Sequence, residues 1–287
     1  MDQKIIDLYG DYVHHHFDRR LFLDRLAKLT GSMAAAAALV PLLSSNYALA
    51  ETVKADDPRI RVLRTDIPGS TGPLKAYVAE PATRGRHGGV LVVHQNRGLN
   101  PHIEDVTRRL AVAGYVAVAV DFLSPLGGTP ADENAAMQMF GKLDKAQTTA
   151  NAMAAVAWIR KRADVNGKVG AVGFCWGGGV INQLAVNDPS LDAGVVYYGT
   201  PAEPSEAAKV HAALLLNYAD AGLDKRNGEL APPYAEALKA AGKDYQLYFY
   251  DGAQHAFNDD TNAARYNKQA ADLAWSRTLA LFAKTLA

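Results

Sequence analysis

Gly173-Phe174-Cys175-Trp176-Gly177 sets a cysteine between two glycines, at a point where the pattern of the chain changes. The short apolar run 168–172 before it predicts a buried strand, and 177–185 after it predicts a helix. A sharp turn from strand to helix needs small flanking residues, because the two elements approach closely there. The pattern therefore predicts a nucleophile elbow with Cys175 at its apex.

Cys175 is also the only cysteine of the chain. This excludes a disulfide or a thiolate metal cluster built within one chain, and a redox role would lack a resolving cysteine. The amides and the positive end of the following helix favour the thiolate form. A buried structural cysteine is the alternative, but the strand-turn-helix setting favours a nucleophile.

The remaining chain alternates strands with helices. After an opening hairpin (61–65 and 74–78), strands are expected at 89–94, 115–120, 168–172, 193–198, 212–217 and 245–250, and helices at 102–113, 145–162, 177–185, 232–241 and 262–286. Run 89–94 is apolar throughout, which is typical of a strand covered on both faces. We expect an α/β protein with a mostly parallel sheet and helices on both faces.

The elbow predicts partners later in the chain, because α/β-hydrolases supply nucleophile, acid and histidine in that order. His255 follows the strand 245–250 and is the predicted general base. Asp220 and Asp224 follow the strand 212–217, and we favour Asp224 as the acid that orients the imidazole. The fold predicted is thus that of an α/β-hydrolase.

An oxyanion hole needs two amides aimed at the developing negative charge. The backbone amides of Trp176, directly after the nucleophile, and of Asn96, after strand 89–94, are the candidates. The residues expected to line a substrate pocket are Gln95, Arg97, Phe122, Tyr198 and Phe257, although each aromatic ring could equally belong to the core.

The charge balance limits the partners. Lys+Arg and Asp+Glu each number 30 in 287 residues, so no net field gathers nucleic acid or an anionic membrane. The adjacent residues His14, His15 and His16 point around a helix rather than toward one ion, and no metal is expected there. A small-molecule ester or lactone is the expected partner, and the oligomeric state stays open.

The first fifty residues differ from the rest. Arg19-Arg20, the small apolar run 33–43 and Ala48-Leu49-Ala50 are typical of a twin-arginine export signal cleaved after Ala50. The apolar run is shorter than the roughly 20 residues that span a bilayer, so stable membrane insertion is not expected. We predict one domain, 51–287, in the periplasm or secreted; the alternative is a retained N-terminal helix on a cytoplasmic protein.

Several motifs together resemble the dienelactone hydrolase (carboxymethylenebutenolidase) family over about 63–286. They are Gly173-Phe174-Cys175-Trp176-Gly177-Gly178, Gly98-Leu99-Asn100-Pro101, Gly114-Tyr115-Val116-Ala117-Val118-Ala119-Val120-Asp121, Tyr197-Tyr198-Gly199 and Gly252-Ala253-Gln254-His255-Ala256-Phe257. The resemblance implies a triad of Cys175, His255 and Asp224 that hydrolyses a cyclic enol ester through an acyl-enzyme, without a cofactor.

Two positions depart from that family. Gln95 stands where the family has a glutamate that takes part in activating the thiol, and an amide cannot accept that proton. Asp259 stands where the family's dienelactone enzymes have a substrate-binding arginine, and Arg97 is a candidate replacement. We therefore expect a small ester or lactone other than dienelactone. The alternative is a catalytically weakened binding protein on a retained hydrolase fold.

Overall fold

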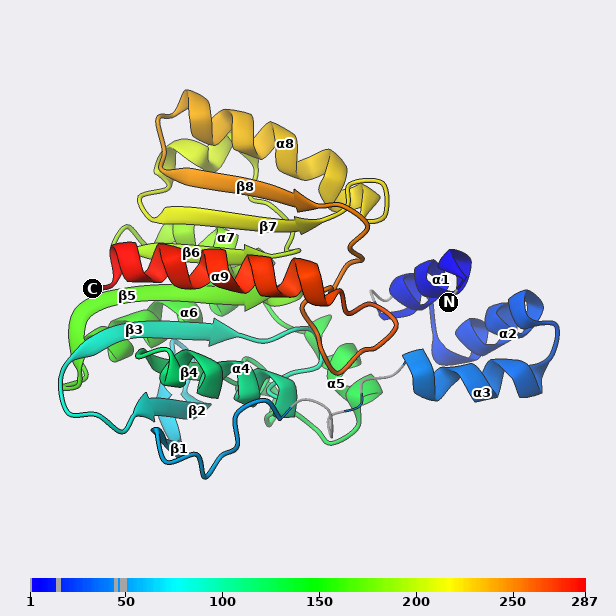
Figure 1. Ribbon diagram of the computed structural model, residues 1–287, viewed down its shortest axis with the longest axis horizontal. Coiled ribbons are helices and arrows are strands. Elements are labelled where there is room, and N and C mark those ends of the chain that lie inside the picture. The colour runs from blue at the N-terminus through cyan, green and yellow to red at the C-terminus, as the bar shows by residue number, and fades with distance from the viewer. Residues whose placement is uncertain (1, 14–16, 44–45, 47–50) are drawn as a thin grey trace.

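The computed structural model describes residues 2–13, 17–43, 46 and 51–287. Its centre is one eight-stranded sheet in the order β1-β2-β4-β3-β5-β6-β7-β8 (Figure 1). The strands are β1 (Ile60–Pro68), β2 (Pro73–Pro81), β3 (His87–Val93), β4 (Val116–Val120), β5 (Val165–Phe174), β6 (Ala193–Tyr197), β7 (Ala213–Ala219) and β8 (Tyr245–Tyr250).

Strand β2 alone runs against the other strands of this order. β1 pairs antiparallel with β2, and β2 pairs antiparallel with β4. From β4 to β8 every pairing is parallel. The opening hairpin and the mostly parallel sheet are thus as predicted. Because parallel strands share one direction, the loops after β3, β5, β6, β7 and β8 all emerge at the same edge of the sheet.

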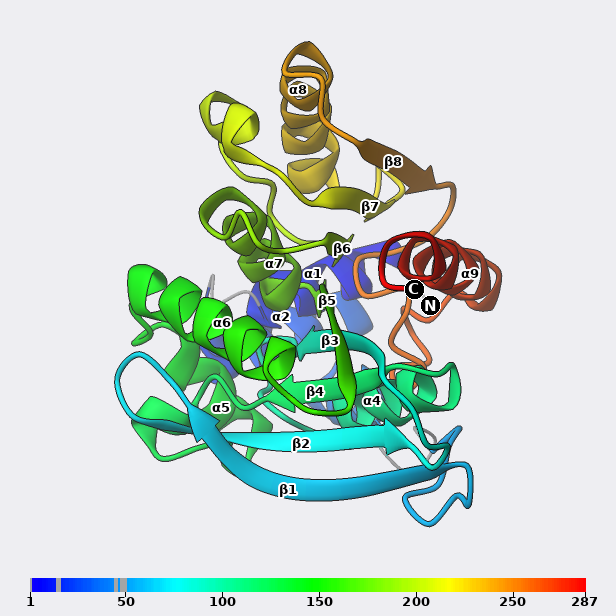
Figure 2. The same ribbon diagram turned by 90° about the vertical axis from the view of Figure 1, so that its left-hand side faces the viewer.

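Helices cover both faces of the sheet (Figure 2). One face carries α4 (Pro101–Val112) and α9 (Lys268–Thr285), and the other carries α6 (Lys145–Arg160), α7 (Trp176–Asn187) and α8 (Lys225–Ala240). The short helices η2 (Ser124–Leu126), α5 (Glu133–Phe140) and η3 (Pro204–Lys209) lie in connecting segments. The predicted α/β class, with a doubly covered sheet, is confirmed.

The central strands are apolar at consecutive positions because both of their faces are covered. In β3, Val90 and Val92 pack into the hydrophobic cluster under α4 and α9, whereas Leu91 and Val93 pack into the cluster under α6, α7 and α8. All four side chains are fully buried. Alternate side chains of a strand point to opposite faces of the sheet, so this one apolar run contributes residues to both hydrophobic clusters.

The predicted boundaries of two helices were wrong. Helix α8 begins at Lys225 and contains Pro232 and Pro233, where the helix had been expected to begin. Burial of Tyr234 and Leu238 against the sheet outweighs the local cost of the prolines. Helix α9 begins at Lys268, because the residues before it form turns rather than helix.

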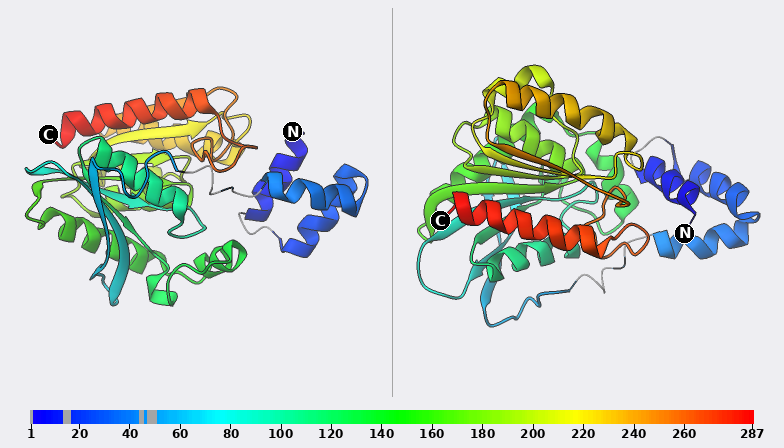
Figure 3. Two further views of the ribbon diagram at one scale, coloured as in Figure 1. Left: turned by 60° about the horizontal axis from the view of Figure 1, so that its bottom comes forward. Right: turned by 45° about the horizontal axis from the view of Figure 1, so that its top comes forward.

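The described residues at the start of the chain include the helices α1 (Gln3–Val13), α2 (Arg19–Thr30) and α3 (Met33–Leu43). They lie beyond the carboxyl ends of the parallel strands (Figures 1 and 3). Asp18 caps α2 by accepting a hydrogen bond from the Leu21 amide at 2.8 Å. Among the described residues, no helix combines the length and apolarity needed to cross a bilayer. His14–His16 and Ala48–Ala50 lie outside the described residues.

Candidate active site

The turn between β5 and α7 has a strained backbone at Cys175. Its φ is 54° and its ψ is −115°, in a region that side-chain-bearing residues rarely adopt. A Cβ atom at Gly173 would lie 2.3 Å from the Gly177 carbonyl oxygen, and one at Gly177 would lie 2.5 Å from the His94 carbonyl oxygen. The two glycines are therefore required by close packing, and the elbow lifts Cys175 above the sheet edge.

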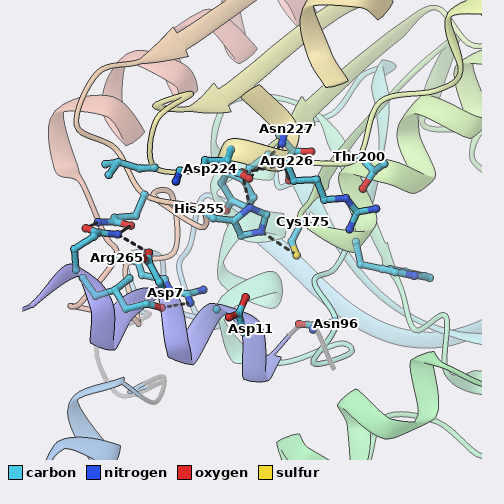
Figure 4. Close-up of a pocket in the computed structure, with 18 of the residues that line it drawn as sticks. Asp7, Asp11, Asn96, Cys175, Thr200, Asp224, Arg226, Asn227, His255 and Arg265 are labelled. Carbon is cyan, nitrogen blue, oxygen red and sulfur yellow. Dashed lines mark hydrogen bonds and ion pairs between the residues drawn. The ribbon is translucent and has the colours of Figure 1, made fainter. Parts of the chain in front are cut away.

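Cys175, His255 and Asp224 form one chain of hydrogen-bonding groups (Figure 4). His255 Nε2 lies 3.2 Å from Cys175 Sγ, and His255 Nδ1 lies 2.8 Å from Asp224 Oδ2. Asp224 caps α8, and His255 follows β8. Since the ring cannot turn without losing one contact, Asp224 holds Nε2 toward the sulfur.

Electrostatics favour a charged imidazole in this arrangement. Burial lowers the pKa of His255, but the Cys175 sulfur and the hydrogen bond that the ring donates to Asp224 raise that pKa to about 10. Burial has the opposite effect on an acid and raises the pKa of Asp224. The hydrogen bond and charge of His255 outweigh this effect and hold the pKa of Asp224 at about 2. A carboxylate next to an imidazolium is therefore the preferred state.

The second candidate acid, Asp220, has a different place. Its carboxylate accepts hydrogen bonds from the amides of Gly222 and Gly252, each at 2.8 Å. These bonds lower the pKa of Asp220 and tie the loop after β7 to the loop after β8. The structure thus brings Asp224, and not Asp220, to His255.

The catalytic cysteine candidate opens into a cavity of about 700 Å³. Trp176 and Asn96, whose amides were proposed as the oxyanion hole, both line this cavity beside Cys175. The Trp176 ring stacks on His94 with ring centroids 5.5 Å apart and meets the edge of Phe140. Tyr198 lines the same cavity, and its ring centroid is 5.1 Å from that of His255.

The other predicted pocket residues divide into two groups. Gln95 and Arg97 line a small cavity of about 20 Å³ next to Cys175 and His255. Phe122 and Phe257 are 1% and 0% exposed and belong to the hydrophobic core rather than to either cavity. The sequence could not separate these cases, because an aromatic residue after a strand suits a pocket wall and a core equally well.

Asp259 and Arg97 lie on the same small cavity. Asp259 accepts hydrogen bonds from the amide and the hydroxyl of Thr261 at 3.1 and 2.5 Å. Arg97 donates to the Tyr9 hydroxyl at 2.7 Å and pairs with Glu133 at 3.4 Å. Both charged groups are thus held by residues of this chain.

Several residues of the site were missed from the sequence. Asn227 donates from Nδ2 to Asp224 Oδ2 at 2.9 Å and supports the acid. An Asp three residues before an Asn at a helix start could have indicated this contact, had the start of α8 been recognised. Others line the large cavity without any local motif: Gln3, Asp7, Asp11, Thr200, Arg226 and Arg265.

His102, Asp259 and Asp260 are the group of described side chains with spacing suited to a metal ion. His102 Nδ1 lies 3.0 Å from Asp260, and Arg109 forms ion pairs with both Asp260 and Asp105. Burial lowers the pKa of His102, and Asp259 and Asp260 raise it above its ordinary value. Two cationic side chains thus neutralise these carboxylates, so the cluster joins α4 to the loop after His255 rather than offering an ion site.

The mostly parallel sheet, the elbow and the order of Cys175, Asp224 and His255 along the chain define an α/β-hydrolase fold. The model of the dienelactone hydrolase family matches residues 74–286, and the chain belongs to that family. A protein of Methylorubrum extorquens, provisionally named carboxymethylenebutenolidase, is 32% identical over 82% of this chain and 87% of its own length. The protein is therefore an ester hydrolase of this family.

Solved structures agree with the fold. A Klebsiella pneumoniae protein, provisionally described as a dienelactone hydrolase, has a TM-score of 0.72 at 30% identity, over 78% of this chain and 99% of its own. A dienelactone hydrolase-like promiscuous phosphotriesterase from metagenomic libraries has a TM-score of 0.71 at 23% identity, over 80% of this chain and all of its own. The second likeness shows the fold alone.

Proposed function

We propose that this protein hydrolyses small esters or lactones through Cys175 as nucleophile, His255 as general acid and base, and Asp224 as the group that orients the imidazole. The observation that carries the proposal is the unbroken contact from Asp224 through His255 to the Cys175 sulfur. Nucleophile, base and orienting carboxylate within hydrogen-bonding distance are what acyl transfer requires.

The first half of the reaction forms an acyl-enzyme. The Cys175 thiolate attacks the carbonyl carbon, and the carbonyl electron pair moves onto oxygen, where the amides of Trp176 and Asn96 would stabilise it. The C–O bond to the leaving group then breaks as the carbonyl reforms. His255 Nε2 gives its proton to the departing oxygen, which yields a thioester on Cys175 and an alcohol or enol.

The second half restores the enzyme. His255, now neutral, takes a proton from water, and the resulting hydroxide attacks the thioester carbonyl. Collapse of the tetrahedral intermediate breaks the C–S bond, so that the acid product leaves and Cys175 returns as a thiolate beside the imidazolium. Asp224 stays ionised throughout, consistent with a pKa held at about 2.

The site supports a small substrate other than dienelactone. Trp176 and Phe140 supply apolar surface to the cavity. Asp259 stands at the position where the family's dienelactone enzymes have a carboxylate-binding arginine, and Gln95 replaces the glutamate that takes part in thiol activation. We expect activation of Cys175 by His255 alone.

Hydrolysis of 4-nitrophenyl acetate and of a neutral lactone by purified protein tests this proposal. Cys175→Ala and His255→Ala should each lower kcat/KM by at least about 10³-fold, with unchanged circular dichroism. Full turnover in either variant would overturn the triad. No turnover of either substrate by the parent, together with an unreactive thiol toward iodoacetamide at neutral pH, would favour the binding protein instead.

We also propose that residues 1–50 direct export. Arg19-Arg20 and the small apolar run 33–43 support this, and the cleavage predicted after Ala50 is the testable step. N-terminal sequencing of protein from the periplasm and from the cytoplasm of an expressing bacterium should give Glu51 in the first and Met1 or Asp2 in the second. An intact N-terminus in both fractions would contradict the proposal.

A further inference from the structure

Helix α1 is joined to the loops that carry the candidate catalytic residues. Gln3 and Gln254, which precedes His255, exchange hydrogen bonds at 3.0 and 2.5 Å. The Ile6 carbonyl accepts a hydrogen bond from Arg265 at 3.4 Å, and the Tyr9 hydroxyl accepts one from Arg97 at 2.7 Å. The helix is therefore attached to the site on the β3 side and on the β8 side.

Apolar packing adds to these polar contacts. Tyr9 is 5% exposed and lies in a hydrophobic cluster that joins α1 to α2, α3 and Met137 of α5. The Arg265 guanidinium lies 5.1 Å from the centroid of the Tyr9 ring, and Arg265 is 6% exposed. A buried arginine against a buried aromatic ring indicates a fitted interface between α1 and the domain.

One face of α1 forms a wall of the large cavity. Asp7 and Asp11 line it together with Gln3, as expected for residues spaced by four on a helix. Figure 4 shows Asp7 and Asp11 on the helix below Cys175 and His255, with Arg226 on the other side of the two. Arg226 and Lys225, at the start of α8, line the same cavity. The nucleophile thus lies between an acidic wall and a basic wall.

We infer that α1 determines the charge selectivity of the substrate pocket, with Asp7 and Asp11 favouring esters that carry a cationic group and opposing esters that carry a carboxylate. The inference rests on the proposed function, since it concerns the substrate of the same site. It applies to the chain that retains residues 1–50.

The physical reason is the charge balance of the pocket walls. Lys225, Arg226 and Arg265 line the cavity and would attract an anionic substrate, and the two carboxylates of α1 offset part of this positive charge. Both carboxylates are solvent-exposed, so each should change relative binding by about two- to five-fold rather than by orders of magnitude. Such an effect should weaken when ionic strength rises, because salt screens exposed charges.

Three esters of similar size provide the test: 4-nitrophenyl butyrate, 4-nitrophenyl 4-(trimethylammonio)butyrate and mono-4-nitrophenyl glutarate, which are neutral, cationic and anionic. Their dissociation constants are measured by tryptophan fluorescence in a Cys175→Ala background, where no acyl-enzyme forms. Adding Asp7→Asn and Asp11→Asn together should shift the cation-to-anion affinity ratio toward the anion by about five- to twenty-fold at low salt.

The control is Asp24→Asn, which removes one negative charge from an exposed position on α2 outside the cavities described. It should leave the ratio within about 1.5-fold, because salt largely screens an exposed charge that does not line the cavity. An unchanged ratio in the double variant, or an equal shift in the Asp24→Asn control, would overturn the inference. Hydrolysis of the neutral ester is measured in the parent protein as a separate experiment. Absence of turnover there would contradict the proposed function, whereas the affinity ratios test the charge selectivity alone.

Discussion

The Asp224 carboxylate lies 2.8 Å from His255 Nδ1, on the side of the ring opposite Cys175. Because of this contact, Nδ1 carries a hydrogen that points at the Asp224 carboxylate. The other ring nitrogen, Nε2, is then the one that exchanges a proton at the Cys175 sulfur. Asn227 fixes the carboxylate in turn. The consequences of this geometry can be measured.

Asp224→Asn should lower kcat/KM for 4-nitrophenyl acetate by about 10²- to 10⁴-fold, because an amide no longer stabilises the imidazolium or fixes its orientation. The matched variant Asp220→Asn alters a carboxylate that bonds only backbone amides of its own and the neighbouring loop among its described contacts. It should retain activity within about five-fold. A larger loss in Asp220→Asn than in Asp224→Asn would reverse the assignment of the acid.

Hydrolysis of the neutral lactone, whose leaving alkoxide needs a proton, should decline as pH rises through about 10, the raised pKa of His255. Above that pH the imidazolium loses the proton that the leaving group needs. The contribution of this group to stability has the same sign: it is complete below the unfolded pKa of about 6.5 and is lost as pH rises through the folded value.

Asp224→Asn supplies the control for this profile. Because Asp224 helps to raise the pKa of His255, the alkaline limb should move to lower pH in the variant. The displacement is measured as kcat/KM for the neutral lactone from pH 6 to 11. An alkaline limb that stays in place would show that another group titrates there.

Gly177→Ala should lower the free energy of unfolding by about 2–4 kcal/mol, since the added carbon would lie 2.5 Å from the carbonyl oxygens of both Val93 and His94. Gly179→Ala in the same helix is the control. Its added carbon would be 3.7 Å from the nearest heavy atom, so the better helix propensity of alanine should leave stability equal or slightly higher. Urea denaturation measures both, and equal stabilities would contradict the close packing of the elbow.

Asp260→Asn should destabilise the fold by about 2–4 kcal/mol, because it leaves the buried His102 and the partly buried Arg109 with one partly buried carboxylate partner fewer. Asp272→Asn breaks the exposed ion pair with Lys268 and should cost less than about 0.5 kcal/mol. Thermal unfolding distinguishes the two. A similar small loss in both would mean that the His102 cluster does little to hold the loop after His255.

Many strands, helices and turns of the domain could be predicted, because they depend on the hydrophobic pattern and on the turn residues of a short stretch of sequence. The apolar run of β3 required a strand covered on both faces, and the glycines around Cys175 required a tight turn between strand and helix. The same reasoning failed for α8. Its prolines suggested a start at Pro232, whereas the cap by Asp224 and the burial of Asn227 and Ala231 place the start at Lys225.

The sequence by itself determined the fold class, the elbow and the chain order of Cys175, an aspartate and His255, since these depend on periodicity and on which residue follows which strand. Only the tertiary structure decided that Asp224 meets His255 while Asp220 ties two loops together. It also decided that α1, in the chain that retains residues 1–50, lines the pocket. Contacts between residues distant in sequence depend on how parallel strands align their ends and on which surfaces remain to be buried, and neither is encoded locally.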